Sequence, residues 1–199
     1  MDHPVRERIE KPERELSKAR DCIEVMRKSK SMLEFEKNWV DFLHHLERSW
    51  NKVENLYRKE PSWNGWVGKY RTLRETDPLL SYLSNARDAD EHTIQEIVKR
   101  QPGSIGINGP RGAGLRIDEM KIGKGLIKIK SPDKIKITFY PGKIGLLPVV
   151  NLGRRYEVPK SHLDKPINPD KVVELAEVAE GFYSGFLKAA KEFISKRGN

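Results

Sequence analysis

The stretch that determines the fold is Met32–Tyr57, MLEFEKNWVDFLHHLERSWNKVENLY. Its large apolar residues recur three or four positions apart, at Trp39, Phe42, Leu46 and Trp50 among others. This spacing is typical of one buried helical stripe, because an α-helix completes a turn in about 3.6 residues. A single amphipathic helix needs other elements to cover its apolar stripe, so the stretch predicts a helical bundle.

Three further segments have helical periodicity. The first is expected to begin near Pro12, the third to span 78–98 with Asp77 as its N-cap, and the last to span 168–196. Residues 61–76 lack a clear period and are expected to be irregular, with their aromatic side chains filling the top of the core. The bundle therefore has four expected helices.

The periodicity changes after the third expected helix. Leu126–Lys130, LIKIK, and Lys134–Phe139, KIKITF, alternate between apolar and polar residues, which is the pattern of strands with one covered face. Ser131-Pro132-Asp133 lies between them and is a turn signal, so the two segments are expected to pair as a hairpin. The segment 103–115 holds five glycines and is not expected to be helical.

These patterns predict a mainly α fold of the α+β class: a four-helix bundle with a small antiparallel β-insertion between the third and last helices. The expected division is 1–101 for the first part of the bundle, 102–167 for a basic β-rich insertion, and 168–199 for the final bundle helix.

Several classes of protein are excluded by composition. No apolar run approaches the roughly 20 residues of a membrane span. The charged residues 1–10 lack the apolar stretch of a signal peptide. The single cysteine, Cys22, excludes an intramolecular disulfide framework. A cytoplasmic location is expected.

The positive charge is concentrated in one segment. The chain has 38 Lys and Arg against 29 Asp and Glu, a net charge of +9, and residues 99–165 alone carry +10. A local basic field indicates an anionic partner, either nucleic acid or a membrane surface, or else serves solubility. The segment lacks the hydrophobic face that anchors a peripheral membrane protein, so no membrane partner is expected.

The lysines of the two alternating segments share one face of the expected hairpin. They are Lys128, Lys130, Lys134 and Lys136, and Arg116 extends the face. Two interpretations remain open for them. Exposed lysines on strands prevent edge-to-edge aggregation, and they also form a track for phosphate groups that makes nucleic-acid binding depend strongly on salt.

The third expected helix carries the candidate for chemistry, in Asn85–His92, NARDADEH. Projected at about 100° per residue, Asp88 and His92 fall opposite the apolar face, one turn apart, and Arg87 lies at its edge. Histidine can exchange a proton with a 2′-hydroxyl, arginine can hold a phosphate, and Asp88 can orient the imidazole. Such a site needs no metal and no cofactor. The alternative is an exposed ion pair between Arg87 and Glu91 beside a solvated His92.

This helix resembles the HEPN family of helical-bundle proteins. The likeness lies in the Arg-x4-His element of Arg87 and His92, with the polar Asp88 directly after the arginine, and in Asp77–Leu80, DPLL, which is similar to a bacterial branch of that family. The resemblance implies a metal-independent endoribonuclease in which the arginine and histidine pairs of two protomers meet at a homodimer interface. It also implies toxin or defence biology, with an antitoxin or a regulatory protein as a partner. It covers the helices and leaves out the strands.

Two functions follow from these observations. One is a HEPN-type endoribonuclease, in which Arg87 binds phosphate, His92 acts as acid and base, Asp88 supports it, and the lysine-rich hairpin carries the RNA. The other is a non-catalytic binding or interaction module with the same bundle, whose basic sheet contacts nucleic acid.

Other polar residues are expected to be structural. Asp90 projects into the apolar arc of its helix, so it is expected to bond a tryptophan or a tyrosine and stabilise the bundle rather than to catalyse a reaction. The adjacent His44 and His45 point about 100° apart and are expected to be exposed or half-buried rather than metal ligands. His162 is expected to lie in a turn.

Overall fold

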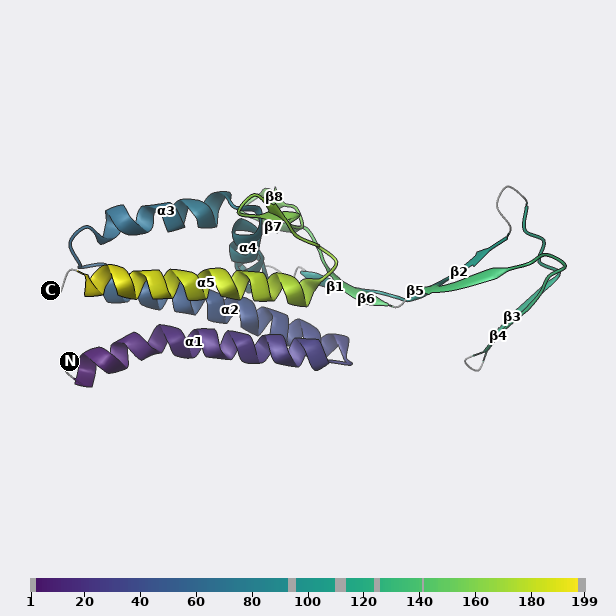
Figure 1. Cartoon of the computed structure of the whole chain (residues 1–199), viewed down its shortest axis with the longest axis horizontal. Coiled ribbons are helices and arrows are strands. Elements are labelled where there is room, and N and C mark those ends of the chain that lie inside the picture. The colour runs from purple at the N-terminus through teal and green to yellow at the C-terminus, as the bar shows by residue number, and fades with distance from the viewer. Residues whose placement is uncertain (1–2, 93–95, 110–113, 124–125, 141, 197–199) are drawn as a thin grey trace. The chain divides into compact units, whose positions relative to one another are not determined.

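The computed structural model describes residues 3–92, 96–109, 114–123, 126–140 and 142–196, and their side chains except those of 3–9 and 92. Within these residues the fold belongs to the α+β class, with five helices and short paired strands (Figure 1). The helices are α1 (His3–Lys28), α2 (Met32–Tyr57), α3 (Trp63–Thr76), α4 (Pro78–His92) and α5 (Val172–Ser195). The strands are β1 (Val98–Gln101), β2 (Ser104–Asn108), β3 (Glu119–Gly123), β4 (Leu126–Lys130), β5 (Lys136–Tyr140), β6 (Lys143–Leu146), β7 (Val149–Asn151), β8 (Arg154–Tyr156), β9 (Ser161–His162) and β10 (Lys165–Pro166).

The chain forms two compact units. The helical unit comprises residues 1–99 and 144–199, and the ribbon unit comprises residues 100–143. The expected insertion, 102–167, is therefore longer than the separate unit, because residues 144–167 belong to the helical unit, where β7, β8 and β9 contact α4. No helix among the described residues is long and apolar enough to span a membrane.

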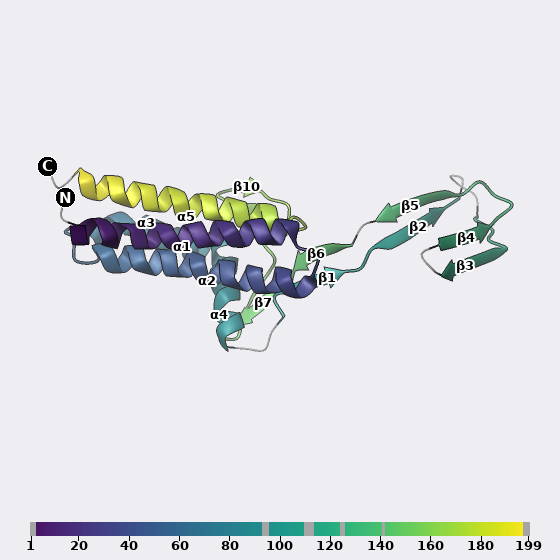
Figure 2. The ribbon, with the colours of Figure 1, turned by 90° about the horizontal axis from the view of Figure 1, so that it is seen from below.

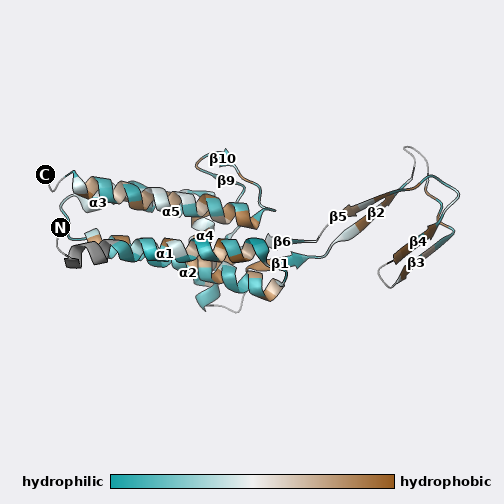
Figure 3. Ribbon diagram, turned by 60° about the horizontal axis from the view of Figure 1, so that its bottom comes forward, coloured by the Kyte–Doolittle hydropathy of each residue, from teal (hydrophilic) through white to brown (hydrophobic). Residues whose placement is uncertain are grey.

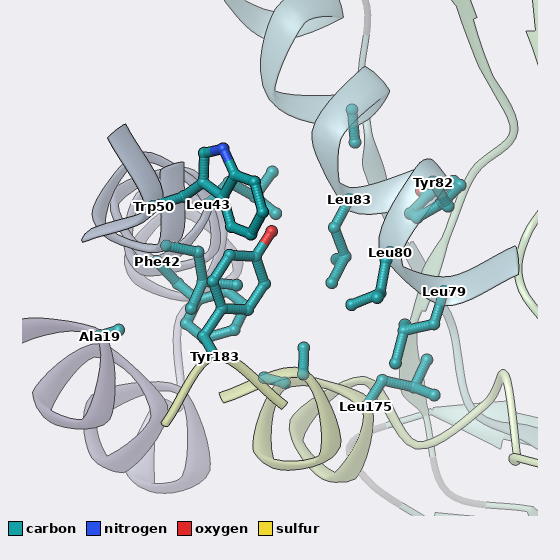
Figure 4. Close-up of a cluster of buried hydrophobic side chains, with 14 of the residues drawn as sticks. Ala19, Phe42, Leu43, Trp50, Leu79, Leu80, Tyr82, Leu83, Leu175 and Tyr183 are labelled. Atoms are coloured by element: carbon teal, nitrogen blue, oxygen red, sulfur yellow. The ribbon is translucent and has the colours of Figure 1, made fainter. Parts of the chain in front are cut away.

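Three long helices form the body of the helical unit. Helices α1, α2 and α5 lie alongside one another, and α4 runs across them part-way along their length (Figures 1 and 2). The stripe expected on α2 is confirmed, because Trp39, Phe42 and Val53 are fully buried. Leu79, Leu80 and Leu83 of α4 point toward α2 and α5 and close this core (Figure 4). The position of α4 is thus set by the apolar residues of its first two turns.

The fifth helix, α3, corrects the expectation of an irregular segment at 61–76. Trp63 is fully buried and donates a hydrogen bond from Nε1 to Glu54, and Trp66 stacks on Phe193 of α5 with ring centroids 4.9 Å apart. The glycines that obscured the pattern, Gly65 and Gly68, have open space where a side chain would project. Aromatic packing against α5 therefore outweighs the low helix propensity of the two glycines.

Three expected helix boundaries were also wrong. Helix α1 begins at His3 and contains Pro12 in its interior, where packing against α2 includes a hydrogen bond from Ser49 Oγ to the Pro12 carbonyl. Helix α4 ends at His92 rather than near 98, and the chain enters β1 at Val98. Helix α5 begins at Val172, because the Asn168 side chain accepts the Asp170 N–H and forms a turn before it.

The strands of the ribbon unit pair differently from the expected hairpin. Strand β4 pairs with β3, and β5 pairs with β2, both antiparallel. The expected hairpin would have placed four lysines side by side on one face. In the structure Glu119 lies opposite Lys130. Ser131 Oγ accepts the Asp133 N–H at 3.0 Å, so the chain bends locally at the expected turn, but the same hydroxyl also bonds the Arg116 carbonyl and the two flanking strands do not pair with each other. The observed register contains one pair of opposite charges and one pair of like charges, Lys121 opposite Lys128, so cross-strand charge alone does not account for the pairing.

Candidate functional site

The start of α4 is held by one carboxylate. Asp77 is the expected N-cap and is confirmed as such: the Leu80 N–H donates to its Oδ1 over 3.0 Å. The same carboxylate binds His162 Nδ1 at 2.9 Å and accepts the Leu163 N–H at 2.7 Å. Burial raises the pKa of Asp77, but these hydrogen bonds, from Leu163 first, bring the net pKa below its usual value. His162 is therefore a buried partner of Asp77, and it lies in strand β9, directly before a turn, rather than in the turn itself.

Arg87 lies on α4 with both terminal nitrogens engaged. Nη1 is 2.7 Å from an Asp88 oxygen, Nη2 is 2.9 Å from Glu91 Oε1, and the side chain is 25% exposed. Its Nε is buried and has no hydrogen-bond partner among the described residues. The ion pair between Arg87 and Glu91, which was the structural alternative at this site, is therefore present. A phosphate that bound Arg87 would have to displace at least one carboxylate.

Asp88 is hydrogen-bonded to strand β7, which lies beside α4. The Asn151 side chain on β7 donates to Asp88 Oδ2 at 3.4 Å and to Asn85 Oδ1 at 2.9 Å. His92 is the last residue of α4, and its side chain lies outside the described residues. The contact expected between Asp88 and His92 is therefore not described, whereas contacts of Asp88 with Arg87 and Asn151 are.

Among the residues that the structure describes, Asp90 does not bond the tryptophan or tyrosine that the sequence predicts. Trp63 donates to Glu54 instead, and the Asp90 carboxylate lies 3.9 Å from His44 Nε2 on α2. The other imidazole nitrogen, Nδ1, is 3.6 Å from Glu91. Asp90 does face α2, but at its level α2 presents the imidazole of His44 and not an aromatic donor. His44 thus joins Arg87, Asp88, Asp90 and Glu91 in one cluster of titratable groups, which we call the α4 cluster.

A second buried charged group was missed by the sequence analysis. Glu15 of α1 binds His45 Nδ1 at 2.7 Å through one oxygen and Lys52 through the other. Burial raises the pKa of Glu15, but the bonds from Lys52 and His45 lower it below the usual value overall. The available signal was the position of Glu15 beside Leu16 on the apolar stripe. Since neither partner lies on the same helix, the sequence could not identify them.

The charged residues of β3 and β4 lie on one face, which also carries Leu126 opposite Gly123. In the register of β3 and β4, Lys121 lies opposite Lys128 and Glu119 opposite Lys130, all on one side. We call this the lysine face. The other predicted residues are not on it: Lys136 lies on β5 opposite Asn108, Lys134 precedes β5, and Arg116 is paired with Asp118 at 3.0 Å. The predicted set of basic residues is thus divided between two ribbons and a loop.

A cavity of about 530 Å³ lies in the helical unit beside α2, α3, α4 and β8. The Arg74 guanidinium lies 4.4 Å from the centre of the Trp50 ring in its wall and is paired with Glu47. Arg154 lies 5.2 Å from the centre of the Tyr156 ring and has no ion-pair partner among the described residues. The wall carries both signs of charge, so the cavity does not by itself indicate the chemistry of a ligand.

Comparisons with known proteins find no family model, no curated protein and no solved structure that matches this chain. Among the described residues, no three His, Cys, Asp or Glu side chains are grouped as they would be to hold a metal ion. The function therefore has to be inferred from the residues and their geometry.

Proposed function

We propose that the protein binds RNA through the lysine face of β3 and β4. The observation that carries this proposal is the register of the two strands, which brings Lys121, Lys128 and Lys130 together on one exposed side. A row of ammonium groups on a strand pair can follow the phosphates of a nucleic-acid strand, because the contact is electrostatic and needs no particular base.

The charge distribution supports this choice over a role in solubility alone. The ribbon unit has ten basic and three acidic residues, a net charge of +7, which leaves only +2 for the helical unit. Lys128 and Lys130 have no ion-pair partner among the described residues, so their charge is available to a ligand. Lys121 is paired with Glu119 on the same strand, and a phosphate that bound it would have to displace this carboxylate. A field of one sign on a small unit attracts polyanions and accelerates their association.

The test measures how RNA affinity depends on salt. A fluorescent single-stranded RNA of about 20 nucleotides, longer than one typical binding site, is titrated with the protein by anisotropy. Replacing Lys121, Lys128 and Lys130 with Gln should reduce the slope of log K against log salt by about 2, because each phosphate contact contributes about 0.7.

The matched control changes three exposed lysines of the helical unit to Gln, namely Lys30, Lys59 and Lys188. Equal slopes for the two triple variants would refute the proposal, since overall charge would then explain the binding. Duplex DNA of the same length is measured beside the RNA. A clearly higher affinity for the DNA would show that DNA, and not RNA, is the ligand.

A second candidate function is a metal-independent endoribonuclease of HEPN type at Arg87 and His92. The observation in its favour is the α4 cluster, which gathers a half-buried arginine, three carboxylates and His44 near the end of the helix on which the Arg-x4-His element lies. In this proposal two protomers bring their clusters together, and phosphate displaces Glu91 or Asp88 from Arg87. The antitoxin or regulatory partner stays a prediction.

This candidate is tested by RNA cleavage in the presence of EDTA. His92→Ala should reduce the rate by about 100-fold or more, the usual contribution of acid–base catalysis. Arg87→Ala should reduce it by a similar factor, because it removes a donor that stabilises charge on the phosphate. Arg14→Ala is the matched control, because Arg14 forms an ion pair with Glu10 at the same spacing of four residues. Cleavage that persists in either variant, or its absence in the unaltered protein, contradicts the nuclease proposal and leaves the RNA-binding proposal intact.

A further inference from the structure

The cavity of about 530 Å³ in the helical unit lies where polar positions of several elements meet. Along each long helix hydrophobic and hydrophilic residues alternate, so a helix has polar positions beside its buried stripe (Figure 3). Helices α2, α3 and α4 contribute such positions to the wall, and strand β8 completes it. The volume suits a small organic ligand, since binding sites of that kind measure about 300–1,000 Å³.

Two ion pairs neutralise most of the charge in the wall. Arg71 donates two hydrogen bonds to Glu54, from Nε at 2.8 Å and from Nη2 at 2.7 Å. Arg74 is paired with Glu47. A ligand that bound to either arginine would have to displace its carboxylate. The chemistry of the site therefore depends on the groups that these two pairs leave over.

Arg154 is a cation of the wall that no carboxylate in the described part of the chain neutralises. Its guanidinium lies 5.2 Å from the centre of the Tyr156 ring, a contact that orients the group and leaves its N–H edge free. Alternate residues of a strand point to the same side, so Arg154 and Tyr156 both reach the cavity from β8. Arg155 points to the other side and is paired with Glu157 at 2.6 Å.

Trp50 brings an unpaired donor to the same cavity. The residue lines the cavity and is only 5% exposed, and its indole N–H donates to no described residue. Unlike Trp39 Nε1, this nitrogen is not sealed inside the core, and it points away from Tyr183 (Figure 4). A buried donor without an acceptor is unfavourable, so the contents of the cavity have to accept a hydrogen bond from it.

Two hydroxyl groups of α4 add to these donors. Ser81 and Ser84 lie about one turn apart and both line the cavity. Ser81 Oγ has no hydrogen-bond partner among the described residues. Ser84 Oγ accepts from Arg74 Nη2 at 3.4 Å, which leaves its own proton to donate. The groups left over by the ion pairs thus include a guanidinium, an indole N–H and two hydroxyls, all of which can donate.

We propose that the cavity binds a small molecule through a phosphate or carboxylate group. Arg154 supplies the positive charge, and a charge-assisted hydrogen bond from arginine to an oxyanion is among the strong ones. Trp50, Ser81 and Ser84 donate to the oxyanion or to other acceptor atoms of the same molecule. Glu75 is an exposed carboxylate of the wall without an ion-pair partner among the described residues, and it opposes the anion.

The first test uses the indole N–H of Trp50 as a reporter. The whole chain, labelled with ¹⁵N, is titrated at constant ionic strength with inorganic phosphate and separately with citrate, and the indole signals of its four tryptophans are followed by NMR. Trp50→Phe assigns the signal of Trp50. That signal should shift and saturate with at least one of the two anions, and the anion that binds more tightly identifies the ligand group. The signal of the fully buried Trp39 should not move.

The second test changes the charges of the wall. Arg154→Gln should weaken binding by about tenfold or more, the effect of losing one charge-assisted hydrogen bond. Arg155→Gln is the matched control, because it removes the same charge from the neighbouring residue of β8, and it should leave the affinity unchanged. Glu75→Gln should strengthen binding, because it removes the opposing charge.

A third variant remains informative if Arg154→Gln disturbs β8. Ser81→Ala suits a helix and should weaken binding by about fivefold, the value of one neutral hydrogen bond. Its control is Ser195→Ala at the end of α5, which does not line the cavity and should leave the affinity unchanged.

Three results would overturn the proposal. A Trp50 signal that moves with neither anion would show that the cavity holds water only. Equal losses in Arg154→Gln and Arg155→Gln would show that the anion responds to the overall charge of β8. Weaker binding in Glu75→Gln would show that the wall attracts a cationic group instead. The RNA proposal survives each of these results, because the lysine face belongs to the ribbon unit.

Discussion

The helical unit and the ribbon unit follow equally regular sequence patterns but differ in what covers their apolar residues. Phe42 on α2 is fully buried between helices, whereas Phe139 on β5 is 70% exposed. Helices of 14 to 26 residues can cover each other within one unit. The strand pairs of five residues have two faces each, and none of their described side chains is buried. An amphipathic pattern therefore predicts which side chains belong to an apolar face. It does not predict whether another element of the same chain buries that face.

The largest expected effect contrasts the two phenylalanines. Phe42→Ala should destabilise the helical unit by about 3–5 kcal/mol, the usual cost of removing a buried aromatic side chain. Phe139→Ala should change the free energy of unfolding by less than about 0.5 kcal/mol, as at an exposed surface position. Urea denaturation followed by far-ultraviolet circular dichroism measures both. Similar losses of unfolding free energy in the two variants would show that Phe139 is packed in a core.

The next effect concerns the buried cap of α4. Asp77→Ala removes the acceptor of Leu80, His162 and Leu163, and leaving buried donors unpaired should cost about 1–3 kcal/mol. Ser31→Ala is the matched control, because Ser31 caps α2 with one exposed bond of 3.5 Å, and it should cost less than about 1 kcal/mol. A smaller loss for Asp77→Ala than for Ser31→Ala would contradict the role assigned to Asp77.

The pH dependence of stability follows from the same carboxylates. The pKa values of Asp77 and Glu15 are lowered in the folded protein, so both groups stabilise it above their unfolded pKa values of about 4. That stability should be lost as the pH falls through the folded values. Denaturation at several pH values should therefore show a steeper acid loss for the unaltered protein than for Asp77→Ala. Parallel curves would mean that Asp77 does not titrate as inferred.

The smallest effect tests the proline inside α1. Ser49→Ala removes the hydrogen bond to the Pro12 carbonyl and should cost about 1 kcal/mol, the typical net value of one such bond. The exposed Ser195→Ala, which loses a bond to Glu192 in the last turn of α5, is the comparison and should cost less. Thermal denaturation resolves the difference. Equal thermal midpoints for the two variants would show that the bond from Ser49 does not stabilise α1 at Pro12 and that apolar packing alone does.

Local patterns predicted much of the helical unit. The stripe on α2, the apolar face of α5, the Asp77 cap and the strands β4 and β5 all follow from residues a few positions apart, and the structure confirms them. The covered apolar face expected on β5 is wrong, because Ile137 and Phe139 are exposed. Within the candidate site, the sequence predicted that Arg87, Asp88 and His92 share one helix, and the structure confirms this. It could not predict that Arg87 is paired with two carboxylates. An arginine that is free to bind phosphate and one that is paired with its neighbours have the same sequence and differ only in the direction of the side chain.

What the sequence determined by itself is the local periodicity, the caps and the concentration of positive charge in one segment. The tertiary structure decided which strands pair, that α3 is a helix, and that Asp77, Glu15 and Asp88 meet partners such as His162, His45 and Asn151. The physical reason is distance along the chain. Periodicity arises from neighbours within one or two turns, whereas pairing and burial depend on groups far apart in sequence that compete for the same partners.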